Sequence, residues 1–329
     1  MSKLRSMRHR VNKSTWKIFP IVLFFLFSFA CSQQEQSKPG DAESNYVRTK
    51  DYHNNGQYDL AISHSRKAIE PDSRSAETYY NRGNAYGEKG QYDRAISEYT
   101  KALETNPRHA VVYYSRGFAF DRKGQYDRAI SDYSNAVKLN ARFAEAYHSR
   151  GIVYGKKGEY DRAISDYSKA LEINPRHANA YNNRGTAYGR KGEYDRAILD
   201  FNKAIEINPS GAGIYYNRGN VYGKKGKYDR AISDYTKALE INPRHSEAYH
   251  SRGFAFTKKS QYDRAISDFN KAIEINPSDA GIYYNRGRAY YSKKEYDRSL
   301  GDFNKAQALG YKIPVEFLEA LRKASGKQN

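Results

Sequence analysis

A block of 34 residues recurs eight times in this chain of 329 residues, and this period restricts the possible folds more than any other feature. Its clearest marker is a tyrosine that most often begins the run Tyr-Asp-Arg-Ala-Ile-Ser. The tyrosine stands at Tyr58, Tyr92, Tyr126, Tyr160, Tyr194, Tyr228, Tyr262 and Tyr296. A fixed period of this length is typical of a solenoid, in which each unit buries its apolar side only against its neighbours. The sequence therefore predicts an elongated stack of units.

Two sets of small and aromatic residues recur at helical spacing within residues 76–109. The first set is Tyr79, Gly83 and Tyr86, and the second is Tyr92, Ala95, Tyr99 and Ala102. Steps of three and four residues place each set on one face of a helix. Gly90 lies between the sets and Pro107 follows them, and both residue types end helices. Each repeat is therefore predicted to be an antiparallel pair of helices, without β-strand.

This spacing of aromatic, glycine, alanine and proline positions resembles the tetratricopeptide repeat family. The resemblance covers residues 42–313 as eight in-phase repeats: 42–75, 76–109, 110–143, 144–177, 178–211, 212–245, 246–279 and 280–313. It implies an all-α solenoid, a right-handed superhelix of helix-turn-helix repeats. It also implies a non-enzymatic scaffold that binds other proteins. In residues 314–329, the apolar positions Val315, Phe317, Leu318 and Leu321 predict a short capping helix followed by a tail.

The seventh position of every repeat departs from the family, which usually has leucine there. This chain has Arg48, Arg82, Arg116, Arg150, Arg184, Arg218, Arg252 and Arg286. An acidic residue follows sixteen positions later in seven repeats: Glu98, Asp132, Asp166, Asp200, Asp234, Asp268 and Asp302. A buried guanidinium without a partner would be costly, so we expect these residues to form ion pairs. The alternative is that the arginines form an anion-binding ladder.

The family resemblance also implies a peptide-binding groove, because the fifth, ninth and twelfth positions of its repeats line the concave face. The implied groove residues are Tyr80, Asn84, Tyr114, Phe118, His148, Ile152, Asn182, Tyr216, Asn220, His250, Phe254 and Tyr284. The alternative for Tyr80 and Asn84 is that they are common repeat residues without a binding role. Phe118, Ile152 and Phe254 fit that alternative less well, because they would be hydrophobic side chains exposed on the groove. The family's clamp for C-terminal carboxylates needs lysine at the fifth position, which no repeat has.

The formal net charge is +19, and many basic residues lie at the end of the first helix of each repeat. Lys156, Lys224 and Lys258 are examples. They either complement the negative end of the helix dipole on a solvated rim or attract an acidic partner segment. Two further functions stay open beside a protein-binding scaffold. They are a carbohydrate- or polyanion-binding protein that uses the basic rim, and an accessory subunit of an envelope enzyme complex.

The sequence contains no glycine-rich phosphate loop, zinc-protease motif or nucleophile elbow. His109, His177 and His245 share one position in alternate repeats. Stacked repeats would hold them on the order of 20 Å apart, at ~10 Å per layer of helices. They cannot share a metal ion, whose ligands lie about 2 Å from it. We therefore expect no catalytic, cofactor or metal site, and we expect these histidines in surface loops.

Residues 1–30 resemble an export signal, with basic residues up to Lys17 and then a short apolar stretch at 18–30. Cys31, the only cysteine, follows directly and resembles the lipidation site of bacterial lipoproteins. An ordinary secreted protein cut at the same bond and an uncleaved anchor are the alternatives. We expect a lipid anchor at Cys31, a flexible tether over 31–41, and a place in the bacterial cell envelope (outer membrane or periplasm in a Gram-negative cell). Nucleic acid is not an expected partner at that address.

Overall fold

The computed structural model describes residues 39–69 and 75–326. Within these ranges the chain forms seventeen helices and no strand. The predicted helix pairs of the eight repeats are confirmed, and one further helix follows them. The export signal, Cys31 and most of the expected tether lie outside the described residues.

Each repeat contributes a first helix and a second helix. The first helices are α1 (Pro39–Asn54), α3 (Ala76–Glu88), α5 (Ala110–Arg122), α7 (Ala144–Lys156), α9 (Ala178–Arg190), α11 (Ala212–Lys224), α13 (Ser246–Lys258) and α15 (Ala280–Ser292). The second helices are α2 (Tyr58–Ile69), α4 (Tyr92–Thr105), α6 (Tyr126–Leu139), α8 (Tyr160–Ile173), α10 (Tyr194–Ile207), α12 (Tyr228–Ile241), α14 (Tyr262–Ile275) and α16 (Tyr296–Ala308). Because α1 begins at Pro39, residues 39–41 are helical, and that end of the expected tether was wrong.

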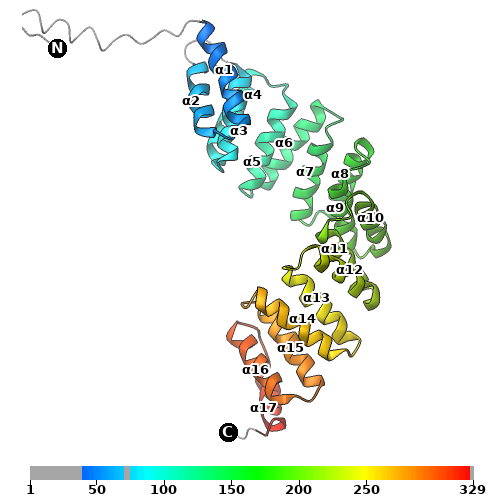
Figure 1. Ribbon diagram of the computed structural model, residues 1–329. Helices are drawn as coiled ribbons and strands as arrows, with labels where there is room; N and C mark the ends of the chain where they lie inside the picture. The colour runs from blue at the N-terminus through cyan, green and yellow to red at the C-terminus, as the bar shows by residue number, and fades with distance from the viewer. Residues whose placement is uncertain (1–38, 70–74, 327–329) are drawn as a thin grey trace, which may run out of the picture.

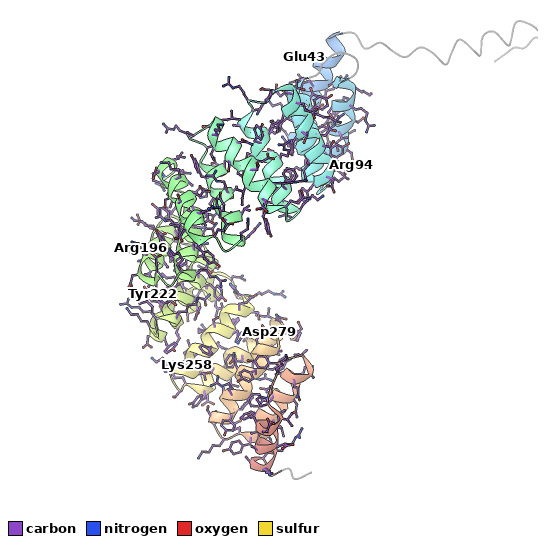
Figure 2. All side chains as sticks on the ribbon, turned by 180° about the vertical axis from the view of Figure 1, so that it is seen from behind. Glu43, Arg94, Arg196, Tyr222, Lys258 and Asp279 are labelled. Carbon is purple, nitrogen blue, oxygen red and sulfur yellow. The ribbon has the colours of Figure 1, made fainter. Side chains whose placement is uncertain are left out.

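The helix pairs stack in chain order along a curved path, with the two ends of the array far apart (Figure 1). Each second helix packs against the first helix of its own repeat and against the first helix of the next. First helices of successive repeats also touch one another from α1 to α15. They form one continuous surface, which we call the first-helix face. Exposed side chains such as Arg94 and Arg196 lie along the margins of the array (Figure 2).

Close contact inside a repeat depends on the small residues that the sequence pattern singled out. Ala95 is fully buried, and Tyr99 is 4% exposed. A Cβ atom added to Gly83 would lie 2.5 Å from Cε1 of Tyr99, so the ring packs directly on the backbone of α3. Gly90 ends the turn between the helices with φ +71°, a conformation that favours glycine.

All seven predicted pairs between a seventh-position arginine and an acidic residue are present. Arg150 is representative: its Nε and Nη2 donate to the two carboxylate oxygens of Asp166, each at 2.7 Å. Its Nη1 donates to Oγ of Ser134 in the preceding repeat, at 2.8 Å. The arginine therefore connects its own second helix to the previous one. Since the donors are engaged in this way, the anion-binding alternative finds no support.

A second set of ion pairs links each repeat to the one before it at the turns. Lys157 in the turn after α7 donates to Oδ1 of Asp127 at the start of α6, at 2.6 Å. The same contact recurs as Lys89–Asp59, Lys123–Asp93, Lys157–Asp127, Lys191–Asp161, Lys225–Asp195, Lys259–Asp229 and Lys293–Asp263. We call these the turn pairs. They engage one lysine of the basic rim in each of seven repeats.

The predicted capping helix is α17 (Val315–Ala324). Leu318 and Leu321 are buried in a cluster with Phe303, and the Phe317 ring meets the Phe303 ring edge-on at 5.2 Å. The expectation for Val315 was wrong, because it stands at the first position of the helix and is 57% exposed. No helix in the described ranges has the combination of length and apolar character that crossing a membrane requires.

Candidate functional site on the first-helix face

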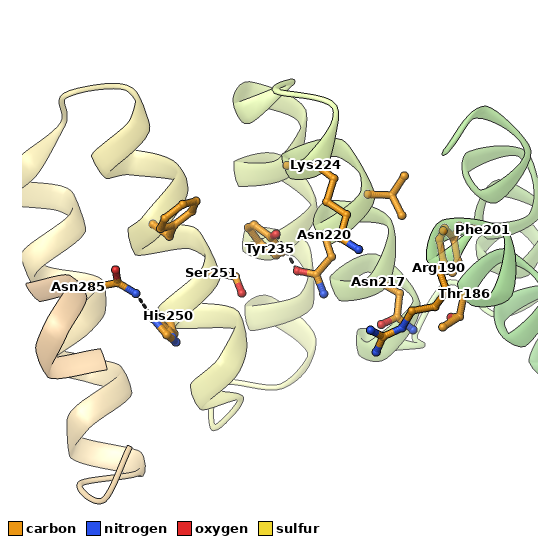
Figure 3. A pocket seen from close by; sticks show the side chains of 14 residues that line it. Thr186, Arg190, Phe201, Asn217, Asn220, Lys224, Tyr235, His250, Ser251 and Asn285 are labelled. Atoms are coloured by element: carbon orange, nitrogen blue, oxygen red, sulfur yellow. Dashed lines mark hydrogen bonds between the residues drawn. The ribbon is translucent and has the colours of Figure 1, made fainter. Parts of the chain in front are cut away.

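A hollow of about 590 Å³ opens on the first-helix face between α9, α11, α13 and α15 (Figure 3). Its floor includes the rings of Phe201 and Tyr235, which come from the second helices α10 and α12. The first helices supply its walls, with polar, basic and apolar side chains from four successive repeats. The hollow is therefore a strip that crosses several repeats.

Two glycines at the twelfth repeat position open this hollow. Gly189 and Gly223 both line it and carry no side chain that could fill it. A Cβ atom on Gly223 would meet only Oη of Tyr235, at 3.6 Å, whereas one on Gly189 would lie 3.2 Å from Cγ2 of Val221. The space beside Gly223 can therefore accept another group without displacing the helix.

Amide side chains in the hollow are oriented by hydrogen bonds between neighbouring repeats. Asn217 donates from Nδ2 to Oδ1 of Asn182 at 3.0 Å, and Asn220 accepts from Oη of Tyr235 at 2.8 Å. Asn285 lies 2.7 Å from Nε2 of His250 through its Nδ2 (Figure 3). The other amide atoms of Asn217 and Asn220 have no partner within the described ranges, so they remain available to a ligand.

The histidine in the hollow is shifted toward its uncharged form. Burial lowers the pKa of His250, against the opposing charges of Asp279 and Glu247. Because Asn285 directs an N–H group at Nε2, this nitrogen accepts and the ring proton sits on Nδ1. The positive charge of the hollow therefore comes from its arginine and lysine.

Arg190 and Lys224 line the hollow, and no acidic residue does. Neither cation has an ion-pair partner in the described part of the chain. Lys258 lies beside the hollow, with Nζ 5.2 Å from the centre of the Phe254 ring. Lys156, for which attraction of an acidic partner was one of the two alternatives, is paired with Asp121 at 2.6 and 2.9 Å. The sequence pattern missed this pair because its members belong to different repeats.

Three of the expected groove residues, Asn220, His250 and Phe254, line the hollow. Phe118 is 46% exposed and Ile152 is half-buried in α5 and α7, outside the hollow. Asn84 accepts a hydrogen bond from Oη of Tyr99, as Asn220 does from Oη of Tyr235, but it lies outside the hollow.

The other fifth-position side chains, Tyr80, Tyr114, His148, Asn182, Tyr216 and Tyr284, are half-buried. Most of their rings lie between a second-helix aromatic ring and a residue of the following loop, as Tyr216 lies between Tyr235 and His245. His109 and His177 occupy the same loop position against Tyr80 and His148. These histidines thus lie in loops, as expected, but they are half-buried because their rings pack against the fifth-position rings.

Sequence reasoning missed Arg190, Asn217, Ser251 and Asn285, which stand at the sixth and thirteenth repeat positions. One signal could have revealed them. The twelfth position changes from Asp121 to glycine in the next three repeats, and this change removes a side chain and a charge from the first-helix face.

Comparison with known sequences identifies the repeat. Profiles described as TPR repeat match residues 50–90, 122–158, 187–226 and 255–294. Profiles described as tetratricopeptide repeat match residues 76–109, 144–177, 212–245, 98–131, 167–198, 234–267 and 280–309. The chain belongs to the tetratricopeptide repeat family. Comparison with proteins of curated function found no match.

Solved structures of tetratricopeptide proteins share the fold. YrrB, described as a TPR protein with an unusual peptide-binding site, is 28% identical with a TM-score of 0.51, over 57% of this chain and 97% of YrrB. A tetratricopeptide repeat protein from Parabacteroides merdae is 24% identical with a TM-score of 0.59, over 77% of this chain and 100% of its own. PilF of Pseudomonas aeruginosa is 19% identical with a TM-score of 0.57, over 65% and 97%. The last two show the fold alone.

Proposed function

We propose that this chain is a non-enzymatic scaffold of the cell envelope that holds an extended segment of a partner protein on its first-helix face. The hollow between α9 and α15 is the observation that carries the proposal. It offers amide groups, cations and the exposed ring of Phe254 along one strip. Tetratricopeptide proteins typically bind other proteins, and YrrB, a relative in sequence and fold, is described as having a peptide-binding site.

The shape and chemistry of the hollow favour an extended peptide over a compact ligand. Its walls come from four successive first helices, and packed helices lie about 8–10 Å apart. A strip of that length suits a chain that runs across the repeats. The available amide atoms of Asn217 and Asn220 both donate and accept, as the peptide backbone does. The ring of Phe254 adds apolar area of the kind that anchors protein interfaces.

The proposed address comes from the sequence alone. Residues 1–30 have the pattern of an export signal, and Cys31 has the position of a lipidated cysteine. Two or more acyl chains at Cys31 would give stable membrane attachment, whereas one chain binds only marginally. We propose that the repeats are held near the membrane surface by this anchor.

A carbohydrate- or polyanion-binding role is less well supported. It would draw on the basic rim, and in seven repeats the turn pairs neutralise one rim lysine with an aspartate. Arg190 and Lys224, which have no ion pair in the described ranges, line the hollow, where Asn217, Asn220 and Phe254 lie beside them.

Capture of partners by the full-length protein from envelope extract tests the proposal. We expect the double variant Asn217→Ala/Phe254→Ser to lose most of the captured partner. Leu199→Ser is the matched control, because Leu199 is 66% exposed on the second helix α10, outside the hollow. Equal capture by the two variants, both with an intact helical circular dichroism signal, would contradict a binding role for the hollow.

A further inference from the structure

The pair between Asp121 and Lys156 shows what a carboxylate does on the first-helix face. Asp121 is the twelfth residue of its repeat and Lys156 is the thirteenth residue of the next one. Nζ of Lys156 contacts both carboxylate oxygens of Asp121, and the Asp121 side chain is only 12% exposed. The chain thus already contains one carboxylate that is largely buried between two first helices and paired with a cation.

The next three repeats keep the cation and omit the carboxylate. Arg190, Lys224 and Lys258 occupy the place of Lys156, and Gly155, Gly189 and Gly223 occupy the place of Asp121. All three cations are exposed, and no ion pair to any of them occurs in the described ranges. Two of these glycines and two of these cations line the hollow. Three adjoining sites therefore repeat the Asp121 arrangement without its acid.

We propose that an acidic, extended peptide segment binds here, with its carboxylates taking the place of the Asp121 carboxylate beside Arg190, Lys224 and Lys258. This inference rests on the proposed function and specifies the partner. Charge complementarity is the reason for the choice, because the hollow contains two cations and no acidic residue. The available amide atoms of Asn217 and Asn220 lie along the same strip and can bond the backbone of the segment.

The spacing of the cations predicts the spacing of the acids. Successive first helices touch, and packed helices lie about 8–10 Å apart. An extended chain advances about 3.3–3.6 Å per residue, so one repeat corresponds to roughly three residues. The segment should therefore carry Asp or Glu at every third position over at least seven residues, with uncharged residues between.

A polyphosphate fits this spacing less well. A nucleic-acid strand carries about one charge per 3.4 Å, which would set roughly three charges against the single cation of each repeat. Most of those charges would face glycine, amide or aromatic groups of the hollow. A nucleic acid is therefore the alternative that the experiment has to exclude.

The test uses the full-length protein and fluorescently labelled synthetic peptides of twelve residues. One peptide has Glu at every third position, a second has the same composition with its glutamates adjacent, and a third has Gln in place of Glu. A single-stranded thymidine oligonucleotide of the same length is the fourth probe. Fluorescence anisotropy should give the tightest binding for the first peptide, with affinity that falls as salt is raised.

Removing the cations should weaken binding of the first peptide. Each exposed pair is expected to contribute about three- to fivefold. The variant Arg190→Gln/Lys224→Gln/Lys258→Gln should therefore bind roughly 30- to 100-fold more weakly, if the sites are independent. The control Lys203→Gln/Lys237→Gln/Lys271→Gln removes the same charge from exposed lysines of the second helices α10, α12 and α14. It should bind almost as tightly as the unchanged protein.

Supplying the missing acid gives a second, independent test. Gly223→Asp places a carboxylate at the repeat position of Asp121, three repeats further along the chain and next to Lys258. An added Cβ atom meets no backbone at this site. It should neutralise Lys258 and weaken binding about three- to fivefold, the loss expected for one exposed pair. Gly223→Asn has nearly the same shape and no charge, so it should leave the affinity nearly unchanged.

Equal affinity for the Glu and Gln peptides, or an unchanged affinity of the triple glutamine variant, would overturn the acidic-segment inference. If Phe254→Ser still weakened both peptides, the proposed peptide-binding function would stand. Tighter binding of the oligonucleotide, lost in the triple variant, would make this a phosphate site and overturn the inference. Absence of binding by the first peptide would also overturn the inference. The capture experiment with envelope extract would then test the proposed function separately.

Discussion

The pair between Arg150 and Asp166 provides the sharpest test of how the repeats are held together. Two parallel hydrogen bonds of 2.7 Å join the guanidinium to the carboxylate. The side chains are 16% and 8% exposed, respectively. Burial disfavours the charged form of Arg150, but the hydrogen bonds and the charge of Asp166 outweigh burial and raise the arginine pKa. We propose a double-mutant cycle on this pair.

The expected loss in the free energy of unfolding depends on which charge each variant leaves without a partner. Arg150→Leu keeps apolar contact near the Tyr147 ring and strands the carboxylate of Asp166, which should lower the free energy of unfolding by about 3 kcal/mol. Asp166→Ala strands a guanidinium that still contacts Ser134 and some water, at about 2 kcal/mol. The double variant removes both charges and should lose only about 2 kcal/mol, which gives a coupling of about 3 kcal/mol.

Urea unfolding followed by circular dichroism measures these free energies, with hydrogen exchange in α7 and α8 as a local readout. The local readout matters because repeat arrays can unfold in parts. Arg48 supplies a control within the same chain. It occupies the same repeat position, is exposed, and faces His64 instead of an acid, so Arg48→Leu should change stability by less than about 0.5 kcal/mol. Additive losses in the double variant would refute the argument that the arginine is retained to pair with the aspartate.

Three further predictions concern pH, binding and address. Burial, and to a smaller extent the charge of His177, lowers the pKa of His148 from 6.5 to about 4. Between these two pH values His148 is protonated in the unfolded chain but not in the folded chain. Stability should therefore fall by about 2–3 kcal/mol between pH 6.5 and pH 4, in a urea titration repeated at each pH, and His148→Asn should remove this loss. Phe118→Ser/Phe254→Ser should keep the helical circular dichroism signal, because both rings are substantially exposed, and should reduce partner capture; full capture would exclude both rings from the interface. Cys31→Ser should release the protein from the membrane fraction or block its processing on cell fractionation, and unchanged fractionation and processing would argue against a lipid anchor.

The scaffold was predictable because its rules act within one repeat. The 34-residue period and the steps of three and four fixed the helices. The cost of a buried charge was enough to pair Arg150 with Asp166. The short capping helix was predicted from Leu318 and Leu321, which lie three residues apart after the last repeat and so share one face of a helix.

The candidate site was only partly predictable because it depends on contacts between repeats. Whether a rim lysine is free is decided by a residue 35 positions earlier, as Asp121 decides it for Lys156. Asn285 likewise contacts His250 of the preceding repeat, 35 positions earlier. A pattern read within one period does not contain these distances, so Arg190 and Asn217 were overlooked while Phe254 was found.

The turn pairs have a consequence for how such a chain can change in length. Every junction from Asp59–Lys89 to Asp263–Lys293 uses the same two residue types at the same two positions. Excising or inserting 34 residues in register would rejoin an aspartate and a lysine that were never neighbours, and the new junction would be chemically the same as the old. The nearly identical stretches 201–219 and 269–287 fit a gene that has grown in this way. Recombination can thus reorder or multiply the residues of the first-helix face while a turn pair still forms at every junction between repeats.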